Sequence, residues 1–202
     1  MTRPLDFRSR LSDVLPDQGA QLVEFAVSLP LLVVFVVGIF DFSSAFTLRL
    51  RLTNLARDAA RTAAADPASD LQNTTPASVM DAFYLIDNYL QANNINDCGV
   101  SSTPTPSGLP LTWTFAANGN GCPSAGLTIT VNRGYYFPVT GAAVPAVDCH
   151  GQSPGGATAV IATCVSIQYP YPWRFGKAAS LLGRNASLPT QISTVAVALN
   201  EN

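Results

Sequence analysis

The chain has 202 residues, of which 48% are hydrophobic and 12% are charged, and its formal net charge is −2 at pH 7. Nucleic-acid-binding surfaces are rich in lysine and arginine, so this charge and the single lysine, Lys177, argue against nucleic acid as a partner. One apolar run is long enough to cross a bilayer and no second run is. The composition therefore predicts one membrane span and one folded domain rather than a polytopic protein.

Residues Leu22 to Phe40 form a nearly continuous apolar run in which Glu24 is the single charged residue. A helix of about 20 apolar residues, rising about 1.5 Å per residue, matches the roughly 30 Å hydrocarbon core of a bilayer. The run therefore predicts a membrane-spanning helix. It is longer than the apolar region of a secretory signal peptide, and no clean small-residue cleavage site follows it before Arg49. Both features argue against removal by signal peptidase.

Helical periodicity continues beyond the apolar run. Apolar residues recur at helical spacing from Phe46 to Ala63, and arginines occupy much of the remaining surface. Asp66 and Pro67 predict the end of the helix, because proline disfavours the helical conformation of the residue before it. We therefore expect one helix from Ala20 to Ala65, apolar in its first part and amphipathic in its second.

All four cysteines lie in the C-terminal part of the chain, at spacings that do not fit a zinc site: Cys98, Cys122, Cys149 and Cys164. An even number of such cysteines is typical of disulfides and of an oxidising compartment. Sequential pairing, Cys98 with Cys122 and Cys149 with Cys164, is favoured among three possible connectivities, which stay open. Positive charges flank the apolar run on both sides, so the positive-inside rule does not decide its orientation. The cysteines do, and they predict a cytoplasmic N-terminus and an extracytoplasmic C-terminal domain.

Residues 67–202 predict one α+β domain. An amphipathic helix is expected over residues 77–92, because four apolar side chains share one face: Val79, Phe83, Ile86 and Leu90. Clusters of glycine, proline and asparagine separate four segments that predict strands, at residues 111–117, 127–132, 160–169 and 192–199. We expect an antiparallel sheet packed on the end of the long helix, with residues 138–158 as a surface loop tied down by Cys149.

Several motifs at fixed spacing surround the apolar run. A leader with three arginines and three aspartates ends in glycine, a carboxylate follows five residues later within the sequence VEFA, and LPLL, GIFDF and LTNLARDAAR segments come after it. Their positions are Gly19 and residues 23–26, 29–32, 38–42 and 52–61. The pattern resembles the TadE/TadG family of pseudopilins from tight-adherence (Flp) pilus systems, which are type IV pilin-like proteins. Two features depart from it: Leu55 stands where the family usually has alanine, and the leader contains as many aspartates as arginines.

The resemblance implies that a prepilin-type peptidase cleaves between Gly19 and Ala20 on the cytoplasmic face. It also implies that Glu24 pairs with the α-amine of Ala20 in a neighbouring subunit, which would compensate for a carboxylate in hydrocarbon. The alternative, an unpaired carboxylate at the level of the lipid headgroups, stays open. The expected regions are a cytoplasmic leader (1–19), a transmembrane helix (20–42), its amphipathic continuation (43–66) and an extracytoplasmic α+β domain (67–202).

The resemblance further implies a structural role, as a minor pilin or pseudopilin that primes, caps or anchors a tight-adherence pilus. The expected partners are other pilin and pseudopilin subunits, the prepilin peptidase, the inner-membrane assembly machinery and membrane lipid. The expected location is the inner membrane, crossed once, with a place in or at the base of a surface filament. The alternative is a membrane-anchored adhesion or ligand-binding module.

Residues suited to catalysis or metal binding are scarce in the sequence. His150 is the only histidine, and its neighbour Cys149 is expected in a disulfide, where it can neither attack a substrate nor bind a metal. Tyr171 and Trp173 belong to an aromatic patch that favours packing over ligand binding. We therefore expect no enzymatic activity, no metal and no cofactor.

Overall fold

The computed structural model describes residues 16–106, 109–123, 125–138, 148–149, 159–174 and 188–201. Most of the expected leader, His150 and most of the expected loop at 138–158 therefore lie outside the described residues. The chain divides into two compact units. Helix α1 (Pro16–Ala65) lies in the first unit as far as Ser43 and in the second from Ser44 onward, and helix α2 and all five strands belong to the second unit.

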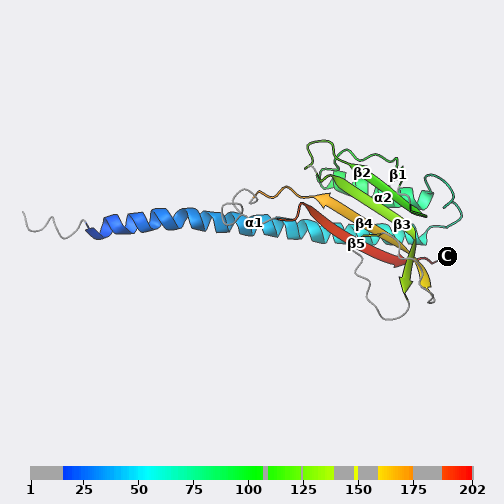
Figure 1. The fold of residues 1–202 in the computed structure, drawn as a ribbon, viewed down its shortest axis with the longest axis horizontal. Coiled ribbons are helices and arrows are strands. Elements are labelled where there is room, and N and C mark those ends of the chain that lie inside the picture. Colours follow the sequence, from blue (N-terminus) through cyan, green and yellow to red (C-terminus); the bar gives the residue numbers. More distant parts are fainter. Residues whose placement is uncertain are drawn as a thin grey trace, which may run out of the picture. The chain divides into compact units, whose positions relative to one another are not determined.

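Helix α1 is continuous through the apolar run and its amphipathic extension (Figure 1). It ends at Ala65, as the Asp66-Pro67 signal predicts, but it begins at Pro16 rather than at Ala20. Within Gly19–Ala65 the helix is long and apolar enough to cross a membrane. Only 6% of its most apolar 18-residue window is buried, whereas the core helix of a soluble protein would be mostly buried. The first part of α1 therefore has the properties of a single membrane span.

Helix α2 (Ala77–Ala92) has the bounds that its apolar periodicity predicts. The four apolar side chains expected on its inner face are all buried: Val79, Phe83, Ile86 and Leu90. The helix begins after Pro76, whose carbonyl accepts hydrogen bonds from the backbone N–H groups of Val79 and Met80. It ends at Ala92 and is followed by Asn93 and Asn94, and Asn94 has a φ of 53°, a left-handed conformation that asparagine tolerates better than most residues.

The five strands form one antiparallel sheet in the order β1-β2-β3-β4-β5, so each strand pairs with its neighbour in sequence. Their bounds are Thr105–Pro106 (β1), Thr112–Ala117 (β2), Leu127–Pro138 (β3), Ala159–Pro170 (β4) and Gln191–Leu199 (β5). The predicted α+β class and the four predicted strands are confirmed. The two-residue β1 was missed because it is too short to show alternation. β3 runs past its predicted end at residue 132, because a shift of register between Asn132 and Tyr135 interrupts the pattern without ending the strand.

The core of the second unit lies between one face of the sheet and the two helices. From α1 it receives mostly small side chains, including Ala56, Ala59, Ala60 and Ala63, which allow a close approach to the sheet. From α2 it receives larger ones, and the rings of Phe83 and Phe115 lie 4.5 Å apart. Burying each large apolar side chain stabilises the fold by about 1.5 to 3 kcal/mol. This core ties the amphipathic part of α1 to α2 and the sheet.

Both disulfides have the pairing that the sequence favoured. The Cys98–Cys122 bond joins the segment after α2 to the connection between β2 and β3, with its Cα atoms 5.4 Å apart. The Cys149–Cys164 bond packs with Tyr135 and Ala162 in a second, smaller core. Each disulfide closes a loop long enough to stabilise the fold by about 3 kcal/mol.

A buried arginine that the sequence did not indicate holds the C-terminal end of α1. Arg133, on β3, is 1% exposed, and its Nη2 donates a hydrogen bond of 2.9 Å to the backbone carbonyl of Asp66. Its Nη1 donates to Thr163 Oγ1 on β4, and Thr163 in turn donates to Asn200 Oδ1. Desolvation by burial lowers the pKa of the guanidinium. A cation at this position also compensates the negative end of the helix dipole, where carbonyl groups lack helical partners.

The stability of the fold around the C-terminal end of α1 should depend on pH through the ionisation of Asp66. Burial, and then the neighbouring Asp81 carboxylate, raise the pKa of Asp66, although Arg133 opposes the shift. Folding therefore favours the neutral form of the Asp66 carboxyl. Its contribution to the stability of the fold is full below the ordinary aspartate pKa of about 3.9, and it is lost as the pH rises through the pKa that Asp66 has in the folded chain. We expect Asp66→Asn to raise the melting temperature at pH 7 and to leave it nearly unchanged at pH 3.5. Thermal unfolding at both pH values measures this, and an equal difference at both would contradict it.

Candidate processing and subunit-contact site

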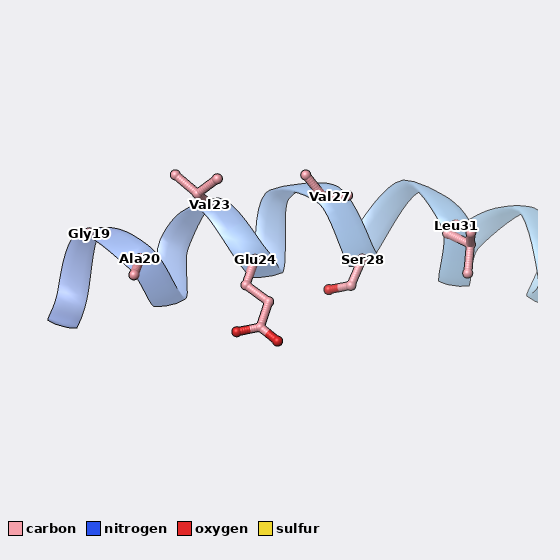
Figure 2. Close-up of a pocket in the computed structure, with 7 residues that line it drawn as sticks. All are labelled: Gly19, Ala20, Val23, Glu24, Val27, Ser28 and Leu31. Atoms are coloured by element: carbon pink, nitrogen blue, oxygen red, sulfur yellow. The ribbon is translucent and has the colours of Figure 1, made fainter.

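The residues that the sequence singled out lie at the N-terminal end of α1. Figure 2 shows that the side chains of Ala20, Glu24 and Ser28, spaced one helical turn apart, lie in one row along the helix, and Val23 and Val27 lie in the neighbouring row that lines the same open pocket. The Ser28 hydroxyl donates to the carbonyl of Phe25, within its own helix. Among the described residues no donor pairs with the Glu24 carboxylate. That carboxylate is therefore available to a cation from another molecule.

Glu24 is surrounded by apolar side chains that no other part of the described chain covers. Leu22, Val23, Phe25 and Val27 are 62–72% exposed. A charged side chain at the centre of a membrane helix costs about 2.5 to 3.5 kcal/mol on insertion scales, and the cost falls toward the interface. Glu24 lies near the start of the apolar run, so its cost is below that range, and a cationic partner would reduce it further.

The Gly19–Ala20 bond lies near the beginning of α1, four residues after Pro16. The first four N–H groups of a helix have no helical acceptor, so this end unwinds at the lowest cost. A Cβ added at Gly19 would meet nothing within 4 Å, so the fold of this chain does not require glycine there. Any requirement for glycine here would therefore come from another molecule, such as an enzyme that binds the segment in an extended form.

One charged residue farther along α1, Asp41, is buried. Asp41 is 5% exposed, and Gly38, about one turn before it, is also buried. Asp41 takes part in an interaction within the chain. This face of the helix therefore does not present its carboxylate to lipid or to a neighbouring molecule, in contrast to the face that carries Glu24.

The remaining candidates from the sequence do not form a reaction site in the described part of the chain. No group of three or more histidine, cysteine or acidic residues there could hold a metal ion. Trp173 Nε1 donates to the carbonyl of Pro189, and its ring packs edge-on against Tyr171 at 4.9 Å. These aromatic side chains pack in the way that the sequence favoured. His150 lies outside the described residues.

A comparison with protein-family models bears on the segment that contains Gly19 and Glu24. Residues 19–61 match the family described as TadE-like protein. The resemblance that the sequence motifs indicated is thereby confirmed over this segment, which begins at Gly19 and ends one turn before the end of α1. The matched segment makes up 43 of the 202 residues, and over it the chain is similar to TadE-like proteins, a family associated with Tad pili. No curated protein and no solved structure matches the chain.

Proposed function

We propose that this protein is a minor pilin or pseudopilin that acts structurally in the assembly of a tight-adherence pilus. One observation carries the proposal: the TadE-like match covers an exposed, apolar helix with Glu24 near its N-terminal end. The helix would hold the subunit in the inner membrane before assembly, and would then pack against the helices of other pilin and pseudopilin subunits. The protein would prime, cap or anchor the filament.

In this proposal a prepilin peptidase cleaves between Gly19 and Ala20 and releases residues 1–19. Cleavage leaves a positively charged α-amine on Ala20, at the end of a helix whose dipole disfavours a cation. Glu24 of a neighbouring subunit neutralises it. Ala20 and Glu24 lie four residues apart, about 6 Å along the helix axis. The pairing would therefore displace neighbouring subunits along this axis by about one helical turn. A single contact would thereby fix the axial register of the assembly.

The proposed orientation places the leader in the cytoplasm, a membrane helix at residues 20–42 with its amphipathic continuation at 43–66, and the α+β domain of residues 67–202 outside. The two disulfides support this orientation, because disulfides form and persist in oxidising compartments and are rare in the cytosol. Contacts with the peptidase and with the inner-membrane assembly machinery follow from it, since both would meet the subunit at the membrane.

An in-frame deletion tests the proposed function. Cells that lack the protein are expected to lose surface pili in electron micrographs, and the wild-type gene supplied in trans is expected to restore them. Levels of the other pilus subunits in the membrane serve as the control for expression. Normal numbers of pili of normal length in the deletion strain would contradict a structural role in assembly and would favour an anchored adhesion or binding module.

A further inference from the structure

The charges of the second compact unit are divided between its two helices. The exposed side of α1 beyond Ser44 carries four arginines and one carboxylate: Arg49, Arg51, Arg57, Arg61 and Asp58. Between Arg61 and Arg133 the sequence contains no lysine or arginine but has five aspartates: Asp66, Asp70, Asp81, Asp87 and Asp97. Among the described residues none of the four exposed arginines forms an ion pair. One molecule therefore presents an acidic helix and a basic helix, and the arginines of the basic helix have no ion-pair partner among the described residues.

The side of each helix that faces away from the core has a defined set of residues. On α1, Arg57 and Arg61 are exposed one turn apart, in line with the exposed Leu50. On α2, Asp81 and Tyr84 are exposed one turn apart, and Tyr84 leaves 47% of a large aromatic side chain uncovered. An aromatic side chain beside a carboxylate suits an arginine, which can pair with the charge and stack on the ring. We call these the basic ridge (Leu50, Arg57, Arg61) and the acidic ridge (Asp81, Tyr84).

The two ridges stand at matching levels along α1. The Asp81 carboxylate lies beside that of Asp66. Asp66 follows Arg61 by five residues, which is about 7.5 Å along the helix axis. Within the second unit, Arg61 and Asp81 therefore lie at similar levels along α1.

We propose that the basic ridge of one copy of this protein docks on the acidic ridge of a second copy. Contact between two basic ridges, or between two acidic ridges, would place like charges together and is disfavoured. The contact is therefore heterologous, and each copy keeps one free basic and one free acidic ridge with which to add further copies in a row. The contact needs neither Glu24 nor cleavage after Gly19, so it goes beyond the proposed function and can fail independently of it.

Charge exchange in the full-length, unprocessed chain tests the contact. Two differently tagged copies are reconstituted in phosphatidylcholine vesicles, and co-purification after crosslinking measures their association. Arg61→Glu and Asp81→Arg are each expected to reduce self-association about tenfold, because each brings like charges together. Mixing the two variants is expected to restore association, since each then offers a ridge that complements the other. Arg51→Glu, which makes the same charge change off the basic ridge, is the matched control and should have a small effect.

Three outcomes would overturn the proposal. Undiminished association of both single variants would mean that the membrane helices or another surface hold the copies together. Loss in both variants without recovery in the mixture would exclude the pairing of Arg61 with Asp81, provided that thermal unfolding shows both variants folded. Normal association of Arg61→Glu in phosphatidylcholine, combined with weaker binding to phosphatidylglycerol vesicles, would assign the arginines to lipid headgroups instead.

Discussion

Replacing Glu24 with glutamine is expected to abolish association with other pilus subunits while the membrane level of the protein stays normal. The variant should insert, because an amide costs less than a carboxylate in hydrocarbon. It should also be processed, because Gly19 is intact. In the assembly, however, the α-amine of a neighbouring Ala20 would face an amide instead of a carboxylate. Leaving a buried charge without its counterion costs about 3 to 5 kcal/mol, which is several hundredfold or more in an association constant.

Co-purification after crosslinking, together with counts of surface pili, measures this effect. The matched control is Ser28→Ala, which lies one turn from Glu24 on the same side of the helix and whose hydroxyl bonds only within that helix. The control should assemble normally. If the glutamine variant also crosslinks and forms pili like the wild type, Glu24 is merely a residue at the membrane interface, and the anchored binding module becomes the better account of the protein.

Replacing Arg133 with alanine is expected to destabilise the second compact unit by about 3 kcal/mol. The change empties a buried site and removes donors to the carbonyl of Asp66 and to Thr163 Oγ1. It also removes the cation at the C-terminal end of α1. Lysine at this position should recover only part of the loss, because its single ammonium cannot reproduce the two directions in which the guanidinium donates.

Thermal unfolding of the full chain in detergent, followed by the fluorescence of Trp113 and Trp173, measures the loss. Arg174→Ala is the matched control, since Arg174 is exposed and surface substitutions usually change stability by less than about 0.5 kcal/mol. A melting temperature of Arg133→Ala equal to that of the control would show that the hydrogen bonds of the buried arginine do not hold the end of α1.

The features predicted correctly from the sequence are those that local patterns determine. The bounds of α2 follow from apolar residues at helical spacing and from the proline and asparagines beside them. The end of α1 follows from Asp66 and Pro67. Arg133 was missed because nothing local marks it: the partners of its guanidinium, the carbonyl of Asp66 and Thr163 Oγ1, lie 67 and 30 residues away. The start of α1 at Pro16 was missed because the expected cleavage point was taken as the start of the helix.

The candidate site at Gly19 and Glu24 rests on one short motif, so it could be proposed from the sequence alone, and it stays a prediction. The relation between the two ridges could not be predicted in that way. Arg61 and Asp81 are both visible as charges in the sequence, but only packing of α1 and α2 on the same sheet shows that each faces away from the core and that the two lie at similar levels. The relative positions of Arg61 and Asp81 depend on tertiary structure and cannot be inferred from sequence periodicity.

The N-terminal residue of the mature protein tests the central claim most directly. The protein is purified from piliated cells and its N-terminus is sequenced, with Gly19→Ala as the control. Alanine fits at this position and favours a helix by about 1 kcal/mol over glycine, so a processing defect in that variant reports recognition by the peptidase rather than misfolding. The account predicts a wild-type chain that begins at Ala20, and an accumulation of uncleaved Gly19→Ala. A wild-type chain that begins at Met1 or Thr2 in cells with an active prepilin peptidase would contradict it.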